Sequence, residues 1–179
     1  MGEATKIEWC DHTFNAWRGC EKVAEGCKNC YAASWARRNP ALFGVWGSQG
    51  TRVVAGEKAW QDPERWNRRA MIWAAHVYHC KLTGAKSPII EWERQCGRLP
   101  DPELMRRPRI FVNSLADVFE DWRGLMANNT GQILTYDSRS PDWGPALNDE
   151  YSHGEHDETP VTMDDVRRRL FTLIDSTPY

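Results

Sequence analysis

The chain lacks any apolar stretch long enough to cross a membrane. A spanning helix needs about 20 consecutive apolar residues, and the mean hydropathy here is −0.68. The first six residues, Met1 to Lys6, hold no apolar run of the kind that directs secretion. Lys6 also stands where an N-myristoylation signal needs Ser or Thr. We therefore expect a cytoplasmic protein without a membrane partner.

Neither sign of charge is in excess. The chain has 23 Lys and Arg against 25 Asp and Glu, a formal net charge of −2. This balance neither favours nor excludes nucleic acid as a partner, because a small basic patch fits within it. With 179 residues, 41% of them hydrophobic, the chain is long enough for one domain with a real core.

Disulfide-rich secreted scaffolds are not favoured, although the chain has six cysteines. Such scaffolds belong to oxidising compartments and follow a secretory segment. Three of the cysteines cluster in one short stretch with the spacing C-x6-C-x2-C, and Gly19 and Gly26 directly precede two of them. The clustered residues are Cys20, Cys27 and Cys30. The scattered ones are Cys10, Cys80 and Cys96.

Local patterns place this cysteine stretch between a strand and a helix. Residues 5–12 alternate loosely and predict a short strand, residues 13–30 predict a loop, and residues 31–38 predict a helix ended by Asn39 and Pro40. A helix N-terminus gathers backbone N–H groups and partial positive charge, which stabilise thiolates and bound anions. The loop is therefore well placed to hold a metal centre.

Further along, Asp62 and Pro63 predict the start of a second helix that runs to about Lys81 and stops before Gly84. Residues 89–95 predict a short helix within a loop, and residues 109–113 form the best strand pattern in the chain. Residues 124–160 are polar and rich in turn residues, which predicts an irregular insertion.

The last predicted element is an amphipathic helix over about residues 163–175. Thr162 is its expected N-cap and Asp165 completes a capping box. One face carries four apolar residues that need a covering sheet. They are Val166, Leu170, Leu173 and Ile174. The order of elements predicts an α/β protein. Because such a helix normally leads into another buried strand, we expect the chain to be C-terminally incomplete, with an unpaired sheet edge.

The clustered cysteines allow three interpretations. Three thiolates with an open fourth position fit a [4Fe–4S] cluster of the radical S-adenosylmethionine type, although the usual spacing there is C-x3-C-x2-C. A zinc site would need a fourth ligand, for which Cys10 or His12 is available. The third interpretation is packed thiols without a metal.

Other constellations have a plain structural explanation beside a functional one. Asn113, Ser114 and Asp117 follow the best strand, where α/β proteins bind ligands, or they form an ordinary capped turn. Two groups on predicted helices are more simply explained as helix surface, although the first resembles a metal site and the second a phosphate-contacting stripe. They are His76, His79 and Cys80, and Arg65, Arg68 and Arg69 with Trp66 and Trp73.

Several runs of sequence together resemble a known family. They are residues 5–15 (TKIEWCDHTFN), 17–20 (WRGC), 26–32 (GCKNCYA), 60–67 (WQDPERWN), 111–119 (FVNSLADVF) and the final helix, residues 164–178. This order of motifs is similar to a bacteriophage three-Cys-motif protein family, uncharacterised and radical-SAM-like. The chain resembles its N-terminal half to two-thirds. Family members usually carry Thr or Ser in place of Cys10 and Pro in place of Ala16.

The resemblance implies a single radical-SAM-like domain over residues 1–179, folded as a partial, open (β/α) barrel with the irregular insert 124–160. It implies a [4Fe–4S] cluster on Cys20, Cys27 and Cys30, with S-adenosylmethionine contacted by four further residues. They are Tyr31, Asn113, Ser114 and Asp117. The implied reaction is reductive cleavage of S-adenosylmethionine, which also needs an electron donor.

The substrate is not specified by these motifs. The phage association favours nucleic-acid or nucleotide modification in a bacterial or phage-infected cell, by analogy alone. The alternative from a different class is a zinc-stapled, non-enzymatic module that binds nucleic acid or a protein partner.

Overall fold

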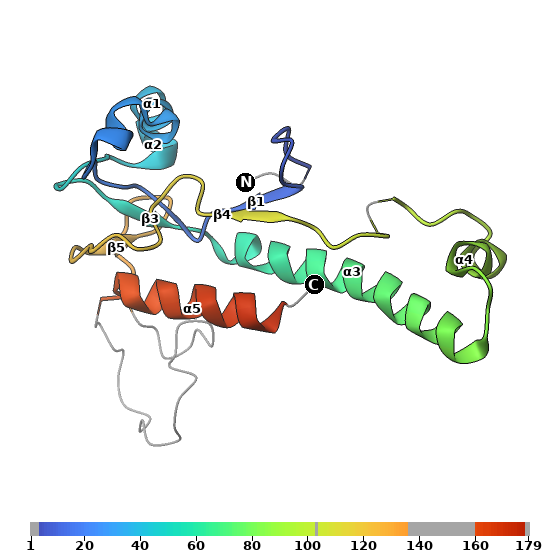
Figure 1. Cartoon of the computed structure of the whole chain (residues 1–179). Helices are drawn as coiled ribbons and strands as arrows, with labels where there is room; N and C mark the ends of the chain where they lie inside the picture. The colour runs from blue at the N-terminus through green and yellow to red at the C-terminus, as the bar shows by residue number, and fades with distance from the viewer. Residues whose placement is uncertain (1–3, 103, 136–159, 178–179) are drawn as a thin grey trace, which may run out of the picture.

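A computed structural model describes residues 4–102, 104–135 and 160–177 of the chain (Figure 1). Among these residues, short strands and helices alternate in a mixed α/β arrangement. The elements are β1 (His12–Phe14), β2 (Trp17–Arg18), the 3-10 helix η1 (Glu25–Asn29), α1 (Tyr31–Arg38), α2 (Pro40–Phe43), β3 (Arg52–Val54), α3 (Glu57–Thr83), α4 (Pro88–Cys96), β4 (Ile110–Val112), β5 (Met126–Ala127) and α5 (Met163–Ser176).

The strands form two small sheets. β1 and β4 run parallel, with Thr13 opposite Phe111. In the second sheet β3 lies in the middle, antiparallel to β2 and parallel to β5. The α/β prediction is therefore confirmed, and the described strands form no closed barrel.

The main core lies where α5 covers the strands. Four residues on one face of α5 are buried, and they belong to the same core cluster as Phe14, Trp17 and Trp60. The four are Met163, Val166, Leu170 and Leu173. Burying each such side chain is worth roughly 1.5–3 kcal/mol. The prediction that Ile174 belongs to this face is wrong, since its side chain is 44% exposed and Met163 takes the buried position at the start of the helix.

The helix α3 is much longer than the core needs. With 27 residues it extends about 40 Å at 1.5 Å per residue. Trp60 and Trp66 in its first half are buried in the core. Its second half runs away from the sheets towards α4, as Figure 1 shows at the right. The helix ends at Gly84, which adopts the left-handed conformation that favours glycine.

Several predicted elements are confirmed with small shifts. The helix at 31–38 has the predicted bounds, α4 matches the short helix at 89–95, and β4 lies within 109–113. The Thr162 capping box is present, with Asp165 N–H bonded to Thr162 Oγ1 and Thr162 N–H bonded to Asp165 Oδ2.

Two predicted boundaries are wrong. Residues 5–11 form turns rather than a strand, and pairing begins only at His12. The helix expected from Asp62 begins five residues earlier, at Glu57, so that Pro63 lies inside α3. As the seventh residue of α3, Pro63 lacks the N–H that would otherwise bond to the carbonyl of Ala59, so it removes one hydrogen bond from the helix.

Three strands were not predicted, namely β2, β3 and β5. Each is two or three residues long, too short for a visible alternation of apolar and polar residues. β5 lies within the segment 124–160 that the sequence analysis expected to be irregular. Met126 and Ala127 are buried beside β3. The prediction for residues 136–159 lies outside the described residues.

Candidate site at the cysteine loop

Asn15 and Asn113 follow the last residues of the parallel strands β1 and β4. Each of them accepts a hydrogen bond from the backbone that follows the other strand. Asn113 Oδ1 accepts the N–H of Ala16 at 2.8 Å, and Asn15 Oδ1 accepts the N–H of Leu115 at 2.8 Å. Ser114 Oγ donates to Asn15 Oδ1 at 3.2 Å. Both asparagines are buried. The carboxyl ends of the two strands are thus held together by side chains.

Asn113 has one polar group that this exchange leaves unsatisfied. Its backbone adopts a φ of +52°, in the left-handed region, and its side-chain Nδ2 is buried without an acceptor among the described residues. A buried amide N–H without a partner is costly, and asparagine tolerates the left-handed region better than most residues. These two features make Asn113 the strongest candidate here for contact with a bound polar group.

Tyr31 ties the cysteine loop to the same strand end. Its hydroxyl donates to the backbone carbonyl of Ser114 at 2.6 Å. Tyr31 is the first residue of α1 and directly follows Cys30. Its side chain is 53% exposed, so the ring lines the surface of the site and is open to a ligand.

Asp117 has a local structural role in the described residues. Its Oδ1 accepts the N–H of Phe119 at 2.9 Å, which closes a turn two residues on. The capped-turn interpretation of this side chain is therefore observed. Asp117 remains exposed, and its charge also acts on Cys20.

All three clustered cysteines are free and partly exposed. Cys27 lies in η1, and the backbone N–H of Cys30 donates to the carbonyl of Cys27 at 3.3 Å. The loop residues 22–26 between the first two cysteines are exposed. Within the described residues, no three His, Cys, Asp or Glu side chains come close enough together to hold a metal ion. The loop therefore brings the thiols into one region without converging them on one point.

The start of the loop is fixed by backbone contacts. The N–H of Gly19 donates to the carbonyl of Leu115 at 3.2 Å, and the carbonyl of Cys20 accepts from Gly47 at 3.1 Å. Gly19 has a φ of +112°, and a Cβ there would lie 2.4 Å from the carbonyl oxygen of Thr51. Only glycine fits this position, so Gly19 sets where Cys20 stands.

A buried ion pair lies beside the start of the loop, and it is not among the features predicted from the sequence. Arg52 is fully buried, and its guanidinium makes a two-point contact with Glu120: Nε donates to Oε2 at 2.8 Å and Nη2 donates to Oε1. Glu120 Oε1 also accepts the backbone N–H of Glu21, next to Cys20, at 2.9 Å. The guanidinium lies 3.9 Å from the ring centroid of Trp122. An Arg within the apolar run of β3 was the signal available in the sequence.

This environment disfavours the thiolate of Cys20. Burial, followed by the negative charges of Glu120 and Asp117, raises the pKa of the Cys20 thiol to about 11, against the opposing charge of Arg52. A metal cation would reverse this balance, because its charge stabilises a coordinating thiolate.

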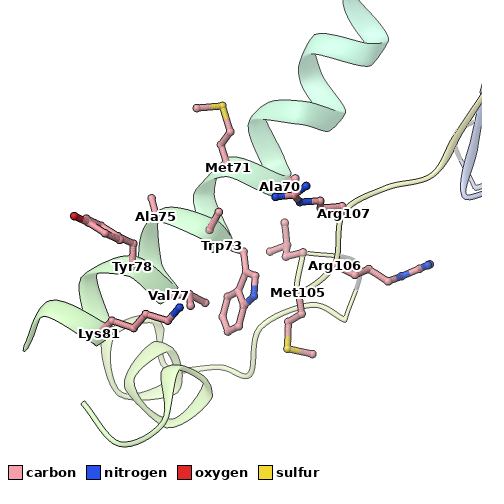
Figure 2. A pocket seen from close by; sticks show the side chains of 12 residues that line it. Ala70, Met71, Trp73, Ala75, Val77, Tyr78, Lys81, Met105, Arg106 and Arg107 are labelled. Atoms are coloured by element: carbon pink, nitrogen blue, oxygen red, sulfur yellow. The ribbon is translucent and has the colours of Figure 1, made fainter. Parts of the chain in front are cut away.

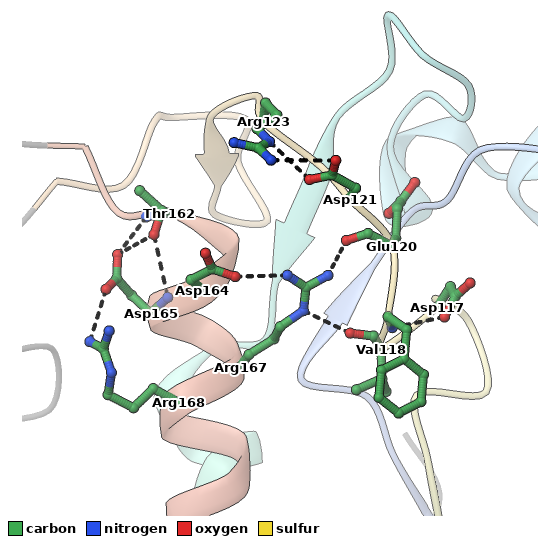
Figure 3. Close-up of polar contacts among 11 residues, drawn as sticks. Asp117, Val118, Glu120, Asp121, Arg123, Thr162, Asp164, Asp165, Arg167 and Arg168 are labelled. Atoms are coloured by element: carbon green, nitrogen blue, oxygen red, sulfur yellow. Dashed lines mark hydrogen bonds and ion pairs between the residues drawn. The ribbon is translucent and has the colours of Figure 1, made fainter.

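The final helix, α5, binds the backbone of residues 118–120, the segment that carries Glu120, as Figure 3 shows. Arg167 of α5 donates through Nε to the carbonyl of Val118 at 2.7 Å and through Nη2 to the carbonyl of Glu120, and it pairs with Asp164 at 2.8 Å. Arg168 pairs with Asp165 at 3.1 Å. The charged end of α5 therefore helps to position Glu120 beside the start of the loop.

Cys10 and His12, considered from the sequence as a fourth zinc ligand, lie at the amino end of β1. The cysteine loop is attached at the other end of the β1–β4 pair. Cys10 precedes β1 and His12 is its first residue, whereas the asparagines follow the last residues of β1 and β4. Both Cys10 and His12 are buried. The His12 ring stacks on Trp66 at a centroid separation of 4.2 Å, and its Nδ1 accepts the N–H of Ala4 at 3.3 Å. Both are thus placed as core residues.

His76 of α3 contributes to the contact with α4, whereas His79 is exposed. His76 Nε2 lies 2.9 Å from the carbonyl of Pro88 and 3.4 Å from Cys80 Sγ. Cys80 is buried, so its expected place on the helix surface is wrong. Trp66 is buried as well, while Arg65 pairs with Asp62 at 2.9 Å. A phosphate-contacting stripe around Trp66, which was the less simple of the two interpretations, would therefore not be a continuous surface.

Comparison with known proteins places these features in a family. The family model of DUF5131, proteins of unknown function, matches residues 4–125. The chain belongs to DUF5131. The matched region contains the cysteine loop, both asparagines and Glu120, and it ends before α5. A search of curated proteins found no match, and neither did a search of solved structures. Membership of DUF5131 therefore carries no activity with it.

Among the described residues, none of the helices combines the length and apolar character that crossing a membrane requires.

Proposed function

We propose that the chain is an iron–sulfur protein of the radical S-adenosylmethionine type, similar to the bacteriophage three-Cys-motif family. The observation that carries the proposal is the attachment of the cysteine loop to the carboxyl ends of two parallel strands. Tyr31 bonds to Ser114 and Gly19 bonds to Leu115, on either side of the three free cysteines. Ligands of α/β proteins bind at this end of the strands.

The three cysteine thiols are the type of ligand that such a cluster requires. Three soft thiol ligands suit an iron–sulfur centre with one open iron. Cys20, Cys27 and Cys30 would hold it. Residues 22–26 are exposed and lie outside both core clusters, so they can move without a change in the core. The gain from metal–thiolate bonds offsets the raised pKa of Cys20.

The chain's own residues supply the rest of the site. In this proposal the Nδ2 of Asn113, which has no acceptor among the described residues, and the exposed ring of Tyr31 contact the polar and aromatic parts of S-adenosylmethionine. Ser114 and Asp117 complete the polar shelf at the strand ends. Glu120 and Arg52 hold the backbone beside Cys20 through the Glu21 N–H. A bound cluster supplies the electron for reductive cleavage of S-adenosylmethionine, drawn from a low-potential one-electron donor.

The positions of Cys10 and His12 favour this proposal over zinc. A zinc site built from the loop would need Cys10 or His12 as its fourth ligand. Both residues lie at the amino end of β1, whereas the cysteine loop is attached to the carboxyl ends of β1 and β4. Three strand residues span about 10 Å, and zinc–ligand bonds are about 2.0–2.3 Å. The substrate class we propose is nucleic acid or a nucleotide, by analogy with the phage association.

The test is anaerobic reconstitution of the full chain with iron and sulfide, followed by visible absorption and iron and zinc analysis. We expect a brown protein whose iron content falls to background in Cys20→Ala, Cys27→Ala and Cys30→Ala. Cys96→Ala is the matched control, because Cys96 is exposed at the end of α4 and should leave the iron content unchanged. A colourless protein with one tightly held zinc, or a Cys27→Ala variant that loads fully, would overturn the proposal.

A further inference from the structure

A groove lies along the second half of α3, on the arm that projects beyond the sheets. We name residues 68–109 the α3 arm. The groove has a volume of about 600 Å³ and lies between α3 and the segment 104–107. Figure 2 shows its lining side chains. The larger apolar ones are Met71, Trp73, Val77 and Tyr78 from α3, and Leu104 and Met105 from the facing segment. In Figure 1 the arm lies at the opposite end of the molecule from α1.

The groove presents aromatic rings at different degrees of exposure. Trp73 is held in place by rings on both helices, with centroids 5.7 Å from Trp92 and 5.6 Å from His76. Tyr78 is 65% exposed. Contiguous apolar surface that is rimmed by polar residues is typical of interaction sites and ligand-binding grooves. In Figure 2 the Trp73 ring points towards the segment 104–107 and the Tyr78 ring points away from it, so the groove has one fixed ring inside it and one accessible ring at its edge.

Positive charge is concentrated on this arm. Residues 68–109 contain nine Lys and Arg against four Asp and Glu, an excess of five, in a chain of net charge −2. The remaining residues therefore carry a net charge of −7. Three cations line the groove itself: Lys81, Arg106 and Arg107. Arg106 pairs with Asp11 at 2.5 Å, whereas Lys81 is exposed and has no ion pair within the part of the chain that the structure describes.

We propose that this groove binds single-stranded nucleic acid. Sequence-tolerant binding of single strands combines a positively charged groove along the phosphates with aromatic rings on which bases stack. Lys81 provides the accessible charge, and Tyr78 and Trp73 provide the rings. A groove of this volume falls within the range of small-ligand sites, which suits unpaired bases rather than a rigid duplex.

An acidic peptide would also be attracted by the positive charge of the groove, but its carboxylate side chains would not stack on the rings of Trp73 and Tyr78. The charge separation between the arm and the rest of the chain also favours a polyanion that approaches from the arm end. The proposal goes beyond the proposed function and does not depend on it, because the groove contains none of the clustered cysteines.

The test is fluorescence anisotropy of labelled oligothymidylate and oligouridylate of about 12 nucleotides, within the site sizes known for single strands. The titrations use the full chain without added metal, over a range of salt concentrations. We expect binding that weakens as salt rises. Comparing oligothymidylate with oligouridylate shows whether the 2′-hydroxyl of the sugar affects binding. A double-stranded oligonucleotide of the same length and polyglutamate serve as competitors, and both should compete poorly.

Two variants locate the binding in the groove. Lys81→Ala should weaken binding several-fold and reduce the slope of log affinity against log salt by about 0.7, the value for one phosphate contact on a single strand. Lys58→Ala is the matched control, since Lys58 is exposed on the same helix near its start, and it should change neither quantity. Tyr78→Ala should weaken binding by about five-fold or more, while Tyr78→Phe keeps the ring and should bind normally.

Three results would overturn the proposal: no binding at low salt, equal binding of polyglutamate, or losses that are the same for Lys58→Ala and Lys81→Ala. Circular dichroism of each variant checks that it is folded. Iron loading is measured separately, so a failure of the cluster proposal and a failure of this one are distinguishable.

Discussion

Asn15 and Asn113 each use a side-chain oxygen to hold the chain that follows the other's strand. Asn15 Oδ1 accepts from Leu115, and Asn113 Oδ1 accepts from Ala16, both at 2.8 Å. Because the two strands are parallel, this exchange fixes their carboxyl ends beside the cysteine loop. The pair is therefore both a structural lock and, through the unsatisfied Nδ2 of Asn113, one wall of the proposed site.

The hydrogen bonds that join the two strand ends predict a loss of stability at position 113 that differs between two substitutions. Asn113→Gly tolerates the positive φ but leaves the buried N–H of Ala16 without an acceptor, which should cost about 1–3 kcal/mol. Asn113→Ala loses the same hydrogen bond and adds left-handed strain of roughly 1–2 kcal/mol. Urea denaturation of both variants measures the difference. Equal stabilities of the two variants would show that the backbone at 113 is not held in the left-handed region.

The raised pKa of Cys20 predicts slow, pH-dependent alkylation. A thiol with a pKa of about 11 is almost entirely protonated at neutral pH, so its reaction with iodoacetamide should accelerate as pH rises towards 11. Asp117→Asn removes one of the negative charges that raise this pKa, so the reaction at a fixed pH should become faster. Mass spectrometry of the Cys20 peptide measures the rate.

Asp121→Asn is the control for this experiment. Asp121 is exposed, pairs with Arg123 and is not among the groups that raise the pKa of Cys20. A rate that rises equally in both variants would indicate a general effect of net charge rather than a local one.

The hydroxyl of Tyr31 is predicted to hold the cysteine loop against the strand end. Tyr31→Phe removes the donor to Ser114 while keeping the ring and its contact with Trp35. The loss of stability should be small, about 0.5–1.5 kcal/mol, but amide hydrogen exchange in residues 20–38 should become faster because the tether is lost. Tyr78→Phe, on the distant α3 arm, should leave that exchange unchanged. Unchanged exchange in Tyr31→Phe would show that the tether contributes nothing to loop order.

Asp11 predicts an acid-dependent loss of stability. Burial would raise the pKa of its carboxyl, but the backbone N–H of Arg109 and the side chains of Arg109 and Arg106 outweigh burial and lower it from 3.8 to about 2. A carboxyl whose pKa is lower in the folded state stabilises the fold above its unfolded pKa. That contribution should be lost as pH falls from about 4 to 2.

Asp11→Asn should be less stable than the parent by about 1–3 kcal/mol near neutral pH, because hydrogen bonds to a charged group are lost. The gap should narrow below pH 4, and thermal unfolding at several pH values measures it. A gap that stays constant down to pH 2 would contradict the role of the Asp11 charge.

The local sequence was sufficient to predict the elements that depend on neighbouring residues. The bounds of α1, the capping box at Thr162 and the position of β4 all follow from periodicity and capping signals over a few residues. The helix start at Glu57 and the three shortest strands were missed. Propensity near Asp62 favours a cap there, and burial of Trp60 against Phe14 and Ala55 overrides it.

The cysteine spacing by itself determined which thiols lie in one stretch of chain, because residues ten apart cannot be separated by more than about 35 Å. Only the tertiary structure decided what surrounds them. Arg52 and Glu120 are 68 residues apart, Asn15 bonds to a residue 100 positions away, and the groove joins α3 to the segment 104–107. Contacts of this kind depend on which strands pair and how a helix crosses them, so they leave no periodic trace in the sequence.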